Sequence, residues 1–347
     1  MKQDIKNLAA LKSEAARLSK LKYDMLVPAT DLIFSCPGGI PTLKMEGNSY
    51  PMLERAQRHI AELIQMPFTY FARLRDNHPQ LLAYDVNTLL SKCSSEKPRL
   101  VRTLGGRVRA IVSNKYKLLE HENVLDCIAP LFDEYRLDVA SCSIDDDRMR
   151  IKLISRKNKV NATVGTTVCF GVMIQNSETS AAALSVIPFA MKLQCTNGLV
   201  LPEYFSSTRK IHRGTEILDL EEYVTPDMGY IFDHVAESID SCLDSSNYRK
   251  VTEAIQRASA LQLADPVKNI QAAAKELGLT TAEQGQALVH LLEGKDFTLM
   301  GLSDAITKTG EDASTYARAT YLEEAGASVL FRPFKPKPVE ETLFIAA

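Results

Sequence analysis

Positively charged side chains alternate with apolar ones in two stretches of the sequence. Residues 148–156 read Arg-Met-Arg-Ile-Lys-Leu-Ile-Ser-Arg, and residues 107–112 read Arg-Val-Arg-Ala-Ile-Val. A period of two is the spacing of a β-strand, so we expect each stretch to place cations on one face and apolar side chains on the other. Such faces suit contact with a polyanion, although a solvated outer surface is the plainer explanation of either strand taken alone.

Further cations flank these strands and complete a candidate nucleic-acid site. From residue 92 to 117 the chain has eight Lys or Arg and one acid, and from 148 to 159 it has six and no acid. Phosphate contacts release counterions, so we expect tight binding at low salt and weak binding at high salt. The candidate phosphate contacts are Arg107, Arg109, Lys115, Lys117, Arg148, Arg150, Lys152, Arg156, Lys157, Lys159, Arg209 and Lys210. The candidates for stacking on single-stranded bases, each also suited to a core, are Tyr116, Tyr204 and Phe205.

The sequence lacks the motifs of ATP, dinucleotide and zinc-protease chemistry. It contains no Gly-x-x-x-x-Gly-Lys-Ser/Thr loop, no Gly-x-Gly-x-x-Gly turn and no His-Glu-x-x-His. We therefore expect no catalytic residue, no cofactor and no metal ligand. Asp145-Asp146-Asp147 leaves two interpretations open, a solvated hairpin turn or the carboxylate ligands of a metal-dependent nuclease.

The composition is that of a globular protein whose two halves carry opposite charge. Hydrophobic residues make up 45% of the 347 positions and charged residues 24%. Residues 1–213 carry 30 Lys and Arg against 21 Asp and Glu, whereas residues 214–347 carry 11 against 22, which predicts two surfaces with different partners. The seven scattered cysteines favour reduced thiols, and no apolar run is long enough to span a bilayer, so we expect a cytoplasmic protein without membrane contact.

The elements that must position these cations predict an α+β fold. We expect an antiparallel sheet with flanking helices, followed by a mostly helical C-terminal region. The predicted strands are 99–104, 107–113, 137–144, 148–155, 166–175 and 183–195. The predicted helices are 4–24, 51–65, 68–76, 79–92, 121–135, 216–244, 248–262, 266–277, 281–293, 300–309 and 311–325.

These elements divide the chain into four predicted regions. An amphipathic helix and an irregular segment occupy 1–50, a basic α+β core 51–213, and an acidic helical region 214–330. The tail at 331–347 is rich in Pro and Lys and ends in an apolar tip, which suits a protein partner. The N-terminal helix needs a groove in its own chain or in a neighbour's, and we expect a homo-oligomer.

Several motifs resemble a phage- and plasmid-borne family catalogued as domain of unknown function 932. Residues 170–178 read Phe-Gly-Val-Met-Ile-Gln-Asn-Ser-Glu and residues 193–199 read Leu-Gln-Cys-Thr-Asn-Gly-Leu, which is similar to the family's central hairpin. Residues 298–307, followed by 316–324, resemble its C-terminal helix pair, and residues 112–116 resemble a strand end in which a serine precedes a basic residue and a tyrosine. The resemblance implies no established activity.

A remoter similarity links the hairpin, helix and cationic antiparallel strands to the phage single-strand annealing proteins of the Red-beta and Erf type. That resemblance implies an oligomer that needs no ATP and binds single-stranded DNA in a basic groove. The acidic helical C-terminal region departs from their pattern.

The leading hypothesis is thus a phage or plasmid protein that binds single-stranded DNA, promotes annealing or recombination, and forms an oligomer. One alternative is a phage interaction or assembly factor without nucleic acid, and another is the metal-dependent nuclease.

Overall fold

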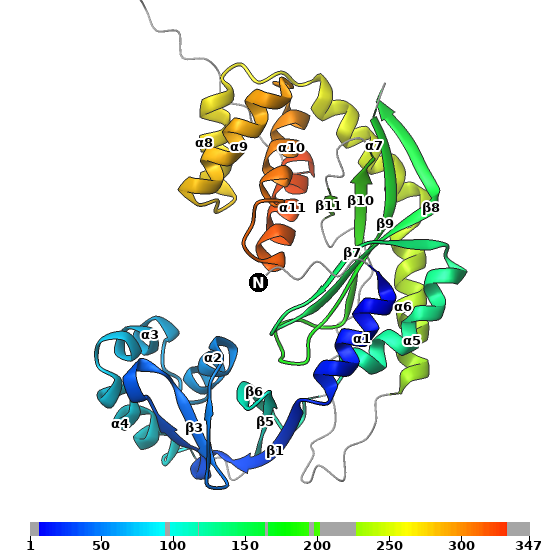
Figure 1. Ribbon diagram of the computed structural model, residues 1–347. Helices are drawn as coiled ribbons and strands as arrows, with labels where there is room; N and C mark the ends of the chain where they lie inside the picture. Colours follow the sequence, from blue (N-terminus) through cyan, green and yellow to red (C-terminus); the bar gives the residue numbers. More distant parts are fainter. Residues whose placement is uncertain are drawn as a thin grey trace, which may run out of the picture.

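The computed structural model describes residues 7–93, 98–116, 118–163, 166–193, 198–201 and 227–331. The fold is α+β, with antiparallel sheets, flanking helices and a helical C-terminal region, as the sequence predicted. Two lobes are visible, a lower one that contains helices α2 to α4 and an upper one built around the largest sheet (Figure 1). Among the described residues, no helix is both long and apolar enough to cross a bilayer.

The largest sheet has five antiparallel strands in the order β11-β10-β9-β8-β7. Their bounds are Leu137–Ile144 (β7), Met149–Thr163 (β8), Thr166–Asn176 (β9), Ser185–Lys192 (β10) and Gly198–Val200 (β11). The β8–β9 pairing shifts register between Ile154 and Lys159, which leaves a bulge in β8. Gly171 of β9 lies opposite this bulge, where an added Cβ would lie 1.8 Å from the carbonyl oxygen of Leu153, so only glycine fits.

Helices cover both faces of this sheet. One face packs against helices whose bounds are Leu8–Ser19 (α1), His121–Glu134 (α5) and Met228–Cys242 (α6), and further along against Ser245–Ala260 (α7). The other face meets helices Leu299–Thr309 (α10) and Tyr316–Phe331 (α11), which Figure 1 shows on the opposite side of the sheet from α6 and α7. Helices Pro266–Glu276 (α8) and Thr281–Gly294 (α9) complete the C-terminal bundle. The five-stranded sheet is therefore a buried middle layer.

The lower lobe contains two three-stranded sheets and three helices. One sheet has the order β1-β5-β6 and the other β2-β3-β4. The strands are Lys22–Pro28 (β1), Ile33–Ser35 (β2), Thr42–Met45 (β3), Asn48–Pro51 (β4), Pro98–Leu104 (β5) and Arg107–Ser113 (β6). The helices are Glu54–Leu63 (α2), Phe68–Asn77 (α3) and Pro79–Leu90 (α4), and they share one apolar core with both sheets.

Local sequence signals predicted several of these elements. The β5–β6 hairpin turns at Gly105 and Gly106, whose φ angles of 56° and 75° are ones that glycine adopts without strain. Helix α5 continues through Pro130. The N-terminal helix finds its groove in its own chain, because Leu11 and Ala15 pack into the core beneath the large sheet.

The irregular segment that the sequence predicted within residues 1–50 contains regular strands, so that prediction was wrong over residues 29–51. These residues form the whole of the β2-β3-β4 sheet, with short 3-10 turns Ala29–Asp31 and Pro37–Gly39 between strands. Strands of three or four residues between glycines and prolines have too short a pattern to recognise. The side chain of Asn87 on α4 bonds both the N–H and the C=O of Phe34, which ties β2 to the helix.

Candidate functional site: a basic pocket between helix α2 and the β5–β6 hairpin

Two cations of β8 are buried, so the prediction that they form a solvent-facing row was wrong. Arg150 and Lys152 are 4% and 3% exposed. Arg150 donates to Asp145 at 2.9 Å, and Lys152 pairs with Glu323 of α11. The ammonium of Lys152 also lies 4.8 Å from the ring centroid of Tyr316. Because helices cover both faces of this part of β8, Lys152 neutralises an acid of α11, and Arg150 neutralises an acid of the β7–β8 turn.

Arg109 of β6 is also buried, at 4% exposure, and cannot reach an external phosphate. Its Nη1 donates to the carboxylate of Glu178 at 2.5 Å. Arg148 is half-buried and donates to the carbonyl of Ala181 at 2.6 Å. Burial, with Arg150 and Arg55 nearby, lowers the pKa of Arg148. Arg109 and Arg148 thus fix the position of the loop that joins β9 to β10.

The remaining candidates divide into exposed residues and residues outside the described part of the chain. Exposed side chains belong to Arg107, Lys115, Arg156, Lys157 and Lys159. Arg156 is paired with the carboxylate of Asp138. Tyr116 is 8% exposed and part of a core, so it does not offer a ring face for stacking. Lys117, Tyr204, Phe205, Arg209 and Lys210 lie outside the described residues.

A buried ion network joins the two lobes at Glu178. Besides Arg109, this carboxylate accepts from Lys22 Nζ and from the backbone N–H of His121, both at 2.6 Å. Burial alone would raise the pKa of Glu178, but the surrounding positive charges, Arg109 and Lys22 among them, hold it well below its usual range. The carboxylate is thus ionised and fixes the loop that follows β9.

Arg102 forms the second centre of the same network. It donates to Asp24 at 2.9 Å and to the carbonyl of Glu178 at 2.8 Å, and it pairs with Glu120. Burial opposes its charge, yet Glu120 and Asp24 raise the pKa of the guanidinium above its ordinary value. The arginines in the middle of the hairpin therefore serve internal ion pairs.

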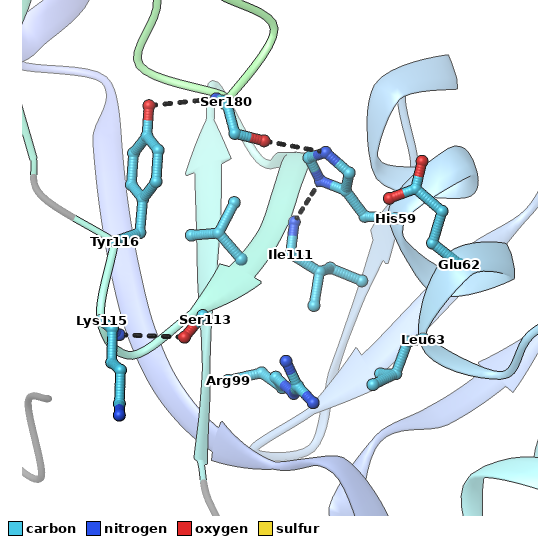
Figure 2. Close-up of a pocket in the computed structure, with 10 residues that line it drawn as sticks. His59, Glu62, Leu63, Arg99, Ile111, Ser113, Lys115, Tyr116 and Ser180 are labelled. Carbon is cyan, nitrogen blue, oxygen red and sulfur yellow. Dashed lines mark hydrogen bonds between the residues drawn. The ribbon is translucent and has the colours of Figure 1, made fainter. Parts of the chain in front are cut away.

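The loop held by this network forms one wall of a pocket of about 760 Å³. Helix α2 supplies a second wall, and the end of the β5–β6 hairpin supplies the floor (Figure 2). The lining residues are His59, Glu62, Leu63, Arg99, Ile111, Val112, Ser113, Lys115, Tyr116 and Ser180. The rim is polar, because Glu62, Ser113, Lys115 and Ser180 are exposed.

Arg99 is the principal charged group in the pocket. It lies on β5 opposite Ser113, half-buried. Its Nε is buried and has no hydrogen-bond partner among the described residues. A buried donor without a partner is costly, so a guanidinium in this condition is a strong candidate for an anion contact.

Ser180 and His59 lie at the opposite end of the pocket from Arg99 (Figure 2). His59 Nδ1 accepts from the backbone N–H of Ile111 at 3.1 Å, so its proton resides on Nε2, 3.1 Å from Ser180 Oγ. Burial, with Arg55 nearby, lowers the pKa of His59 to about 4, and the ring is neutral at pH 7. Since the imidazole donates to the hydroxyl, it cannot remove the serine's proton, and the pair is not a nucleophile with its base.

Ser180 is held by Tyr116. The tyrosine Oη donates to the carbonyl of Ser177 at 2.9 Å and accepts from the backbone N–H of Ser180 at 3.1 Å. Ser180 has a φ of 58°, in the left-handed region that non-glycine residues rarely adopt. The tyrosine predicted to stack on bases instead sets the position of a pocket hydroxyl.

The three aspartates between β7 and β8 form a turn. Asp145 Oδ1 accepts from the backbone N–H groups of Asp147 and Arg148 at 2.9 and 2.7 Å, which is an Asx-type turn. Asp147 contacts Arg55 at 3.4 Å. No group of three or more metal-ligating side chains occurs among the residues that the structure describes. The turn interpretation rests on the backbone hydrogen bonds of Asp145, and the carboxylates of Asp145 and Asp147 contact other groups of the protein.

Comparisons of the chain with protein families, with curated proteins and with solved structures find no match. The pocket combines Arg99, whose Nε has no hydrogen-bond partner among the described residues, with a second cation, three hydroxyl groups and an apolar floor, which suits a ligand that is both anionic and partly apolar.

Proposed function

We propose that this protein binds single-stranded nucleic acid without ATP, and that the pocket between α2 and the β5–β6 hairpin is its principal contact. The observation that carries the proposal is the buried Nε of Arg99, which has no partner in the described part of the chain, in a pocket that Lys115 also lines. A phosphodiester supplies the acceptor that this guanidinium lacks. Single strands fit the proposal best, because a pocket flanked by helix α2 admits a separated nucleotide more readily than a duplex.

Exposed cations outside the pocket would extend the contact along the strand. Lys157 and Lys159 are exposed on the bulged part of β8, and Arg107 is exposed at the far end of the hairpin. The resemblance of residues 170–178 and 112–116 to the phage and plasmid family, and the remoter likeness to annealing proteins, support a role in annealing or recombination. The segment 112–116 lines the pocket through Lys115, and Ser180, which also lines it, follows the segment 170–178 by two residues.

Fluorescence anisotropy with labelled single- and double-stranded oligonucleotides at two salt concentrations tests the proposal. We expect preferential binding of the single strand. Replacing Arg99 and Lys115 together by Gln should weaken this binding at least about tenfold and make the salt slope shallower by about 1.4, since each single-strand phosphate contact contributes about 0.7. Lys275→Gln on α8, another exposed lysine, is the matched control and should change neither. Unaltered binding by the double variant would remove the proposal.

A second candidate function is protein assembly, and the lower lobe provides an observation in its favour. Tyr84 and Leu81 of α4 are 69% and 46% exposed, and Ile33 of the adjoining β2 is 54% exposed. Apolar side chains gathered in this way suit a protein interface. We propose that the protein forms homo-oligomers through this region, and light scattering of the wild type and of Leu81→Gln with Tyr84→Gln tests this. An unchanged mass would count against it.

We further propose that the protein acts in the cytoplasm of a host cell. Six cysteines in the described part of the chain are free thiols, and Cys36, Cys142, Cys169 and Cys242 are buried. Burial raises the pKa of Cys242 to about 12, which keeps this thiol protonated and unreactive. Such thiols suit a reducing compartment.

A further inference from the structure

We infer that the pocket takes a single nucleotide of the bound strand, with its phosphate at Arg99 and Lys115 and a hydrogen-bond acceptor of its base at Ser180. The inference rests on the proposed function and specifies what one pocket recognises. It follows from the unequal distribution of charge, hydroxyl groups and apolar surface around the pocket (Figure 2).

The anionic group of the ligand belongs at the Arg99 end. Lys115 lies on the same side of the pocket as Arg99, whereas Glu62 lies beside His59 on the α2 wall (Figure 2). A phosphate near Glu62 would be repelled, and a phosphate near Arg99 meets a guanidinium that has an unsatisfied donor. The charges thus orient the ligand along the pocket.

The opposite end offers a hydrogen-bond donor. Ser180 Oγ accepts the Nε2 proton of His59, as the tautomer of His59 requires. Its own hydroxyl proton is therefore directed to another acceptor, and the serine is exposed at the pocket rim. Carbonyl oxygens and ring nitrogens of nucleobases are acceptors of this kind.

The middle of the pocket is apolar. The side chain of Ile111 lies between the two ends, and that of Leu63 lies beside Arg99 (Figure 2). A nucleobase has apolar faces and a polar edge, so it can pack against these aliphatic groups while its edge reaches Ser180. The volume of about 760 Å³ is within the range of pockets that enclose ligands of nucleotide size.

Paired anisotropy titrations test the inference with two probes, a labelled oligothymidylate and a strand of equal length that lacks bases. We expect the wild type to prefer the intact strand by about tenfold, the contribution of one well-held base. The variant Ser180→Gly removes the hydroxyl, and it retains the N–H that bonds Tyr116 and relaxes the left-handed φ. It should bind the intact strand about fivefold more weakly and the baseless strand equally well.

Arg99→Gln provides the matched comparison, because loss of a phosphate contact should weaken binding of both strands by the same factor. If the wild type binds the two strands with equal affinity, or if Ser180→Gly weakens both alike, the inference is overturned while nucleic-acid binding stands. If the wild type binds neither strand, the proposed function fails and the inference fails with it.

Discussion

Arg109 Nη1 lies 2.5 Å from the Oε2 atom of Glu178, and the two side chains are 4% and 1% exposed. This contact connects the middle of β6 to the loop after β9, across 69 residues of sequence. The loop carries Ser180 to the rim of the pocket. A buried ion pair remote from solvent therefore determines where a surface hydroxyl lies.

Neutralising Glu178 should destabilise the fold. In Glu178→Gln the buried Arg109 loses its counter-charge and Lys22 keeps only Glu120, so we expect a loss of about 3–5 kcal/mol in the free energy of unfolding, measured by urea denaturation. Glu54→Gln breaks an exposed pair with Arg58 and should cost less than about 1 kcal/mol. Equal effects of the two substitutions would contradict the network described above.

Two glycine-to-alanine substitutions should change the stability of the protein in opposite directions. Gly171→Ala places a Cβ 1.8 Å from the carbonyl oxygen of Leu153, so strand β8 must move and we expect a loss of several kcal/mol, on the order of severe overpacking. Gly285→Ala in α9 meets no atom within 4 Å and should stabilise the helix by about 0.5–1 kcal/mol. Thermal unfolding followed by circular dichroism distinguishes the two variants. A Gly171→Ala protein as stable as the wild type would rule out the close contact between β8 and β9 at Gly171.

Stability should fall in mild acid. Burial lowers the pKa of both His59 and His121 from 6.5 to about 4, so the unfolded chain binds protons that the folded chain does not. The contribution of the two neutral histidines to the free energy of unfolding is complete above a pH of about 6.5. It decreases as the pH falls toward 4, by up to about 1.4 kcal/mol per pH unit for each histidine. Urea titrations between pH 7.5 and 4.5 measure the slope. His59→Asn should reduce it by about half, and a slope of zero in the wild type would show that the histidines are not buried as neutral rings.

Substitutions of buried and of exposed cations in β8 should have different effects on stability and on oligonucleotide binding. Lys152→Met leaves Glu323 half-buried without its partner and should lower stability by roughly 2–4 kcal/mol. Lys157→Gln with Lys159→Gln should leave the unfolding midpoint unchanged and make the salt slope of oligonucleotide binding shallower by up to about 1.4. Paired denaturation and anisotropy measurements check both. A lower midpoint in the exposed double variant would mean that these lysines also have structural partners.

The sequence predicted elements whose signals are local. The hairpin with Gly105 and Gly106 and the turn at Asp145 are encoded within a few residues, and both were predicted correctly. The direction in which the cations face depends on contacts far along the chain. Lys152 and Glu323 are 171 residues apart, and a period of two cannot distinguish a solvent-facing row from one covered by a helix.

The pocket was not predicted, because its walls come from three separate segments. His59, Arg99 and Ser180 show no common spacing, and serine and histidine are ordinary residues in isolation. One signal was present in the sequence. Glu178 is the single acid between Asp147 and Glu203, within strands rich in cations and apolar residues. An acid in that setting indicates a buried counter-charge, and it marks the loop that reaches the pocket.

The pairing of Lys22 with Glu178 has a consequence for biosynthesis. Lys22 leaves the ribosome 156 residues ahead of the carboxylate that it contacts. Lys22 also pairs with Glu120, so one of its two carboxylate partners follows it by 98 residues and the other, Glu178, by 156. The apolar core of the lower lobe comes from residues 25–111, so it is translated before the carboxylate that joins this lobe to the large sheet, and a polypeptide released before residue 178 would lack that contact.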